Sequence, residues 1–163
     1  MGNYRESELG NIVVLDKKRD MNAARNKYLK LWFAVFGMHI LHQLEESISF
    51  FKWYVQYADK MGRWAILDLK IANLAIAHPL YFVFASLGQF LVVSILAFLF
   101  RKNEQAMKWL VFTYIIGLNF FLIWHIGASY IVHSYAPIMV TCLMGLYFTP
   151  KWLYLLFKNS ISR

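Results

Sequence analysis

One cysteine, Cys142, occurs among the 163 residues, which excludes an intramolecular disulfide bond and leaves the redox compartment open. A cleavable signal peptide is not expected, because the first apolar run begins only near Leu31 and no small-residue cleavage site follows it. N-myristoylation is not expected either, since Glu6 stands where the motif requires Ser or Thr. The N-terminal segment is therefore expected to lack both a removable leader and an acyl anchor.

Acidic residues are scarce, with 9 Asp and Glu against 17 Lys and Arg, which gives a net charge of +8. This charge could indicate nucleic-acid binding, but many of the basic residues precede the first apolar segment and are interspersed with acids. Juxtamembrane basic residues set orientation and contact anionic lipid headgroups. Membrane lipids are therefore the expected partners. Nucleic acid is not expected, because no recognition fold remains once the apolar helices are set aside.

Apolar residues dominate, at 60% of the chain with 18% aromatic, and the mean hydropathy is +0.44. A soluble domain is usually about 45–50% apolar. The sequence therefore predicts an all-α, polytopic membrane helical bundle with four transmembrane helices. A polar cytoplasmic arm, part helical from Asp20, is expected over 1–27, and the transmembrane bundle over 28–163. About 20 residues cross the hydrocarbon, which predicts spans over 28–57, 71–100, 107–133 and 138–157.

The three prolines and the charged loops complete the predicted topology. Pro79 is expected to kink the second span, with a re-entrant pair of half-helices as the alternative. The turn at Pro137 is expected to follow the third span, and Pro150 to mark the interfacial end of the fourth. The arm, the 101–108 loop and the C-terminal tail are basic, whereas the turn before Pro137 carries no fixed charge and the 52–63 loop only a modest basic excess. The positive-inside rule therefore predicts that both termini are cytoplasmic.

All five histidines fall in apolar segments. At 100° per residue, the first span places His39, His42, Glu45 and Glu46 within an arc of about 120°. A carboxylate at the centre of a membrane costs about 2.5–3.5 kcal/mol. Protonation, a bound cation or protein donors must therefore offset two of them.

Histidines of the later spans could join this cluster. His125 of the third span lies about as deep as His42, and His78 precedes Pro79 in the second. Nitrogen and carboxylate ligands at helical spacing suit a divalent metal, Zn, Fe or Mn. The predicted ligand set is His42, Glu45, Glu46 and His125, to which His39 or His78 adds. His42, Glu45 and Glu46 are the predicted catalytic residues.

Other interpretations of these residues stay open. His78 and His133, taken singly, are typical of core histidines bonded to a backbone carbonyl, and His39 could be structural in the same way. The His42, Glu45 and Glu46 cluster could form a structural network, or an acid/base site without metal.

The segment His42-Gln43-Leu44-Glu45-Glu46 resembles the signature of the HXXEE family of small membrane proteins. A later histidine, His125, and a turn from Tyr135 to Thr141 follow in the order typical of that family, with Ile138 where the family usually has glycine. The resemblance covers about 31–150. It supports a site built on the motif residues and His125, and it leaves the reaction open, because the family has no settled general activity.

These observations favour a membrane-embedded enzyme, metal-dependent or acid/base, that acts on a lipid-soluble substrate by redox chemistry, hydrolysis or isomerisation. The alternatives are a protein that binds or transports protons or metal ions, and a structural subunit of a membrane complex. The sequence leaves the oligomeric state open, a homo-oligomer included.

Overall fold

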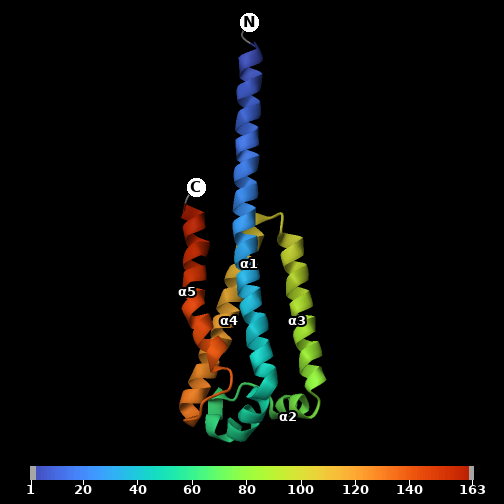
Figure 1. The fold of residues 1–163 in the computed structure, drawn as a ribbon, viewed down its shortest axis with the longest axis vertical. Helices are drawn as coiled ribbons and strands as arrows, with labels where there is room; N and C mark the ends of the chain where they lie inside the picture. The colour runs from blue at the N-terminus through green and yellow to red at the C-terminus, as the bar shows by residue number, and fades with distance from the viewer. Residues whose placement is uncertain (1–2, 162–163) are drawn as a thin grey trace.

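The computed structural model describes the backbone of residues 3–161, together with the side chains of Val14 and residues 27–158. Within that range the chain is all-helical, as predicted, and contains no strand (Figure 1). The elements are α1 (Asn3–Met61), the short 3₁₀ helix η1 (Gly62–Trp64), α2 (Leu69–Ala77), α3 (Pro79–Phe100), α4 (Glu104–Val132) and α5 (Met139–Ile161).

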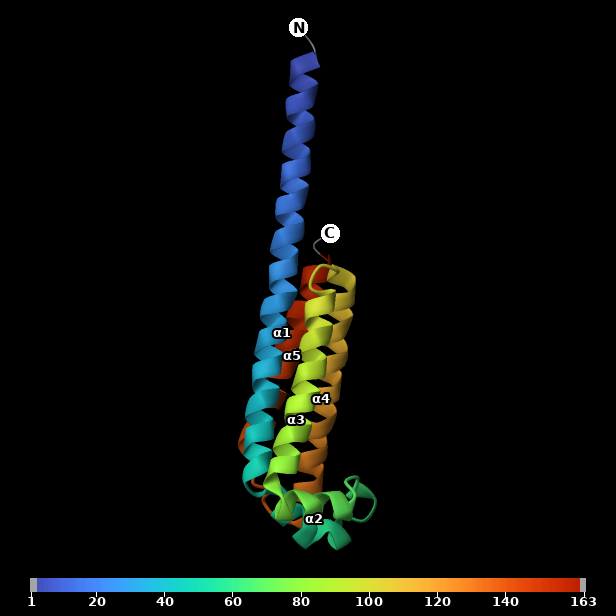
Figure 2. The ribbon, with the colours of Figure 1, turned by 90° about the vertical axis from the view of Figure 1, so that its right-hand side faces the viewer.

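The first helix, α1, includes both the polar arm and the first apolar segment. The arm was expected to become helical only from Asp20, but the helix already runs from Asn3. No proline occurs before Pro79, so nothing in the sequence interrupts the backbone hydrogen bonds of α1. The N-terminal part of α1 projects beyond the bundle, at the end where α5 also terminates (Figures 1 and 2).

The second apolar segment is two helices rather than one kinked span. α2 ends at Ala77, and α3 begins at Pro79, so the predicted kink is wrong. Proline suits the first turn of a helix, where no intrahelical acceptor is needed, and it disfavours helical geometry in the preceding residue, His78. α2 consequently lies across the end of the bundle, and α3 alone runs along it (Figure 1).

The fourth apolar segment passes through its proline. α5 continues past Pro150 to Ile161, so the helix passes through the proline, as the predicted span over 138–157 does. The proline removes one backbone hydrogen bond. Leu156, fully buried beyond it, keeps the last turns packed against the core, with partly buried Trp152 and Leu153 beside it.

Among the described residues, three helices are long and apolar enough to cross a membrane: Pro79–Phe100, Glu104–Val132 and Met139–Lys158. The described part of α1 is not apolar enough to join these three, because the histidines and glutamates of its central part lower its hydropathy. Large apolar side chains are exposed along all three spans, including Phe84, Phe121 and Leu143. This surface is typical of contact with lipid.

The core lies where α1, α4 and α5 meet. Val35 of α1, Ile115 of α4 and Cys142 of α5 are completely buried in it. α3 is more peripheral, because only Ser86 and Ala97 of its 22 residues are buried. The loosely covered side of the bundle is therefore the side that carries α3.

Gly145 allows α5 to approach α4 closely. A Cβ at this position would meet the buried Leu122 side chain, with Cγ and Cδ2 each at 3.4 Å and Cδ1 nearer still. We expect Gly145→Val to lower the free energy of unfolding by about 1–3 kcal/mol, because the core has no room for the added atoms. Gly88→Val is the matched control, since a Cβ there meets no described atom within 4 Å. Equal thermal unfolding curves for the two variants would contradict this packing.

Candidate functional site

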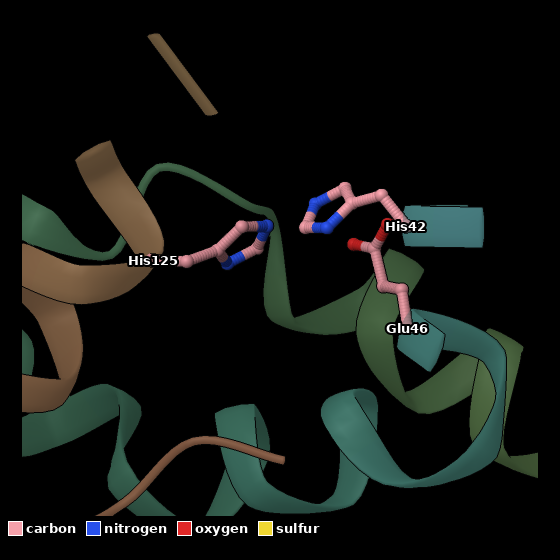
Figure 3. Close-up of side chains that lie close together, drawn as sticks. All are labelled: His42, Glu46 and His125. Carbon is pink, nitrogen blue, oxygen red and sulfur yellow. The ribbon is translucent and has the colours of Figure 1, made fainter. Parts of the chain in front are cut away.

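Three side chains from two helices meet in the interior of the bundle. His42 and Glu46 project from α1 toward His125 of α4 (Figure 3). One potential ligand atom from each lies within 4.8 Å of the other two. His42 and His125 are each only 2% exposed, and Glu46 is partly buried. We call these three residues the His/Glu/His group.

Helical spacing and aromatic packing position this group. His42 and Glu46 are four residues apart, so they lie one above the other on the same face of α1. The His125 ring packs edge-on against Phe50 at 4.7 Å and beside Trp124 at 4.6 Å, both between ring centroids. The Trp124 indole N–H donates to the backbone carbonyl of Trp64 at 2.7 Å, which fixes this wall of the site.

Each histidine of the group has a nitrogen with an unused hydrogen-bonding capacity. Among the described residues, His42 Nε2 and His125 Nδ1 are buried and have no hydrogen-bond partner. Buried polar atoms are paired in the great majority of cases. Two such atoms on neighbouring rings, whose centroids are 5.1 Å apart, are therefore a local feature that needs a functional explanation.

Glu45 faces a different neighbour from Glu46. Its Oε2 accepts from the backbone N–H of Thr141 at 2.9 Å and also from the Thr141 hydroxyl. That N–H is among the first four of α5, which have no acceptor within the helix. Glu45 thus holds the N-terminus of α5 and lies outside the His/Glu/His group, although the sequence grouped it with Glu46.

The Thr141 hydroxyl determines the tautomer of His42. The hydroxyl has one proton, which it donates to Glu45. His42 Nδ1 lies 2.8 Å from the same oxygen and must therefore supply the proton of that hydrogen bond. His42 then carries its proton on Nδ1, which leaves a lone pair on Nε2. A metal or a proton can bind there.

His39 lies beside the group but in its own set of hydrogen bonds. Its Nδ1 is 2.5 Å from the Tyr114 hydroxyl of α4, and its Nε2 is 3.3 Å from Gln43 Nε2. Gln43 in turn accepts from the Ser86 hydroxyl of α3 at 2.8 Å. Both ring nitrogens of His39 are therefore engaged, so His39 is not an additional ligand in this arrangement.

The remaining histidines lie away from the group. His78 is exposed at the junction between α2 and α3, where its ring contacts Tyr81. It therefore lies outside the His/Glu/His group, although the sequence indicated it as an additional ligand. His133 is exposed too, so the core interpretation does not hold for it, and it ends α4 in a left-handed conformation, with φ of 52°. Asn119 bonds to Thr149 of α5 at 2.8 Å.

A cavity of about 470 Å³ extends from the group between α1, α2, α3 and α4. His42, Glu46 and His125 form part of its wall, and most of the rest is apolar. Tyr81 of α3 and Phe121 of α4 line the cavity and are 59% and 49% exposed. The cavity therefore opens to the outer surface on the side of α3, and its volume is typical of a small-molecule site.

Three residues of the site were not among the predicted functional residues: Thr141, Gln43 and Tyr114. Gln43 lies within the His42–Glu46 motif, and Thr141 ends the turn segment that resembles the family, so both were within the recognised pattern. No sequence feature indicated a role for Tyr114, because the chain has ten tyrosines and this one lies in an ordinary apolar helix.

Comparison with known proteins supplies the family. No curated protein and no solved structure matches the chain. The model of a family described as "Protein of unknown function with HXXEE motif" matches residues 32–155, which include the whole His/Glu/His group and Thr141. This match spans most of the chain and contains the motif from His42 to Glu46, so the chain belongs to the HXXEE-motif family.

Proposed function

We propose that this chain is a membrane-embedded enzyme whose His/Glu/His group binds a divalent metal and acts on a lipid-soluble substrate. The observation that carries the proposal is the position of the group on the wall of an apolar cavity that opens beside α3. A substrate dissolved in the bilayer can enter such a cavity without crossing water.

The donor set fits a metal such as Zn, Fe or Mn. Two imidazoles and one carboxylate are the ligands of many catalytic zinc sites, which keep a further position for substrate or water. Tetrahedral zinc with bonds of about 2.0–2.1 Å holds its ligand atoms about 3.3 Å apart. The three atoms already lie within 4.8 Å of one another, so small side-chain rotations can bring them together. The open lone pair of His42 Nε2 supports the same assignment.

The residues of the group have separate tasks in this proposal. A divalent cation supplies Lewis-acid polarisation of a substrate oxygen. His42 is held in the ligating tautomer by Thr141 and, through it, by Glu45. Glu46, on the cavity wall, has a carboxylate oxygen available to take up or return a proton. The apolar wall excludes water. Hydrolysis, isomerisation and redox chemistry on a lipid all fit this division of tasks.

We further propose that α1 crosses the membrane as a fourth span, with both termini cytoplasmic. α1 packs against α4 and α5 along the bundle, so its apolar part shares their depth. The loop between α3 and α4 lies at the end of the bundle from which the arm projects (Figure 1), and its residues include Arg101 and Lys102. Basic residues at one end favour that end as the cytoplasmic side.

Elemental analysis of the detergent-purified chain tests the metal. We expect about one Zn, Fe or Mn per chain in the wild type and a large loss in His42→Ala, because that substitution removes a ligand. Loss of an outer-shell partner alone typically weakens metal affinity about 10–100-fold, and a direct ligand matters more. His78→Ala is the matched control, since His78 is exposed and outside the group.

The outcomes distinguish a metal-dependent enzyme from an acid/base enzyme without metal. Equal metal content in the wild type and His42→Ala would contradict a metal at this group. Metal-free protein that still converts a lipid substrate, and loses that ability in Glu46→Gln, would instead assign acid/base chemistry to Glu46 and His42.

A further inference from the structure

A second polar cluster lies on the wall of the same cavity. His39 and Gln43 of α1 and Tyr114 of α4 all line the cavity, together with the three residues of the His/Glu/His group. Ser86, buried on the inner side of α3, supports this second cluster from behind. The four residues His39, Gln43, Ser86 and Tyr114 form the polar chain discussed below.

The direction of each hydrogen bond in the polar chain follows from the chemistry of its donors. In the structure the Gln43 amide has its Oε1 toward the Ser86 hydroxyl, which donates to it, and its NH₂ group toward His39. An amide NH₂ can only donate, so His39 Nε2, which it faces at 3.3 Å, must accept. A neutral imidazole with Nε2 as acceptor carries its proton on Nδ1. His39 Nδ1 therefore donates to the Tyr114 oxygen at 2.5 Å.

This sequence of donors leaves the proton of Tyr114 unused. The Tyr114 oxygen accepts from His39, so the phenolic O–H cannot point at that imidazole. Tyr114 is only partly buried and borders the cavity, so its proton can be presented to a molecule bound there. The Trp32 ring, 4.9 Å away between centroids, packs against the Tyr114 ring and restricts its position.

We propose that the Tyr114 hydroxyl is a hydrogen-bond donor for a carbonyl oxygen of the molecule that occupies the cavity. A carbonyl oxygen can only accept, and it therefore matches the oriented O–H of Tyr114 on the cavity wall. The ligand class is a long-chain ketone, aldehyde or ester, with an apolar chain along the apolar wall. His39, Gln43 and Ser86 are positioning residues that keep the Tyr114 proton directed into the cavity.

This inference deepens the proposed function and rests on it in one respect: the cavity is taken to receive a lipid-soluble molecule. A carbonyl group held by Tyr114 lies in the same cavity as the His/Glu/His group, where it can be polarised or attacked. The polar chain itself does not depend on a metal.

Infrared spectroscopy of a bound ketone tests the proposal. The probe is 2-heptadecanone with a ¹³C-labelled carbonyl, added to the chain in nanodiscs, with heptadecane as the oxygen-free control. A donated hydrogen bond lowers the carbonyl stretching frequency. We expect a shifted band in the wild type and none in Tyr114→Phe, with ketone affinity reduced about 2–10-fold and heptadecane affinity unchanged.

Gln43→Leu tests the positioning of the Tyr114 proton while leaving Tyr114 in place. Without the amide donor, His39 can accept from Tyr114 instead, so we expect the shifted band to weaken although the hydroxyl remains. Thermal unfolding of both variants establishes that the fold is retained. An unchanged shifted band in Tyr114→Phe, or no ketone binding by the folded wild type, would overturn the inference.

The metal proposal and the carbonyl proposal can fail separately. The same spectra are recorded in the presence of a chelator and with His125→Ala. A shifted band that persists under both conditions, but is lost in Tyr114→Phe, supports the polar chain whether or not the His/Glu/His group binds metal.

Discussion

Zinc added to the purified chain is expected to raise its free energy of unfolding by about 4 kcal/mol when free zinc is about 1,000 times the dissociation constant. The reason is linkage: the folded bundle holds His42, Glu46 and His125 within 4.8 Å of one another, and the unfolded chain does not. Thermal unfolding with zinc and with excess chelator measures the difference. The double variant His42→Ala/His125→Ala is expected to show almost no response to zinc.

A matched double variant excludes general binding of zinc to histidines. His78→Ala/His133→Asn also removes two histidines, but both are exposed and lie outside the group, and asparagine tolerates the left-handed conformation of residue 133. This control is expected to respond to zinc as the wild type does. A response that falls equally in the two double variants would show that zinc acts elsewhere.

Glu45→Ala is expected to lower the free energy of unfolding by about 3–5 kcal/mol. The substitution removes two hydrogen bonds between a carboxylate and Thr141, and hydrogen bonds to charged groups contribute about 1.5–3 kcal/mol each. It also removes a negative charge from the N-terminus of α5, where the helix dipole favours one. Chemical denaturation in detergent, followed by circular dichroism, measures the loss.

Two further variants show whether the position of Glu45 matters. Glu45→Gln retains an oxygen that can accept from Thr141 and is expected to lose only part of the stability. Glu46→Ala removes the adjacent glutamate, which accepts no hydrogen bond from α5 within the part of the chain that the structure describes. Equal destabilisation by Glu45→Ala and Glu46→Ala would contradict the assignment of separate roles.

Much of the site could be predicted from helical geometry. The arc calculated for α1 places Glu45 and Glu46 on opposite sides of His42. In the structure Glu45 faces α5 and Glu46 faces the cavity. His125 was matched to His42 by depth in its span, and their rings are 5.1 Å apart. Periodicity and depth are properties of a single helix, so they can be read before the helices are packed.

The differences from prediction arise where two segments must be placed relative to each other. His78 was expected near the centre because it falls in an apolar segment, but the helix breaks at Pro79 and leaves it at the end of the bundle. Whether a proline kinks a helix or separates two depends on what the two halves pack against. Pro150, by contrast, lies within one continuous helix, because Leu156 beyond it is held in the core.

The sequence by itself determined that the chain is helical and rich in membrane-compatible segments, and that ionisable residues lie on one face of α1. Local physics suffices for this, since hydropathy and a 3.6-residue period require no knowledge of neighbours. Only the tertiary structure decided that Glu45 holds α5 and that Glu46 faces the cavity. It also decided that Tyr114 stands at the end of a series of hydrogen-bond donors. These roles depend on atoms as far as 99 residues apart in sequence, as for His42 and Thr141, and only packing brings such atoms together.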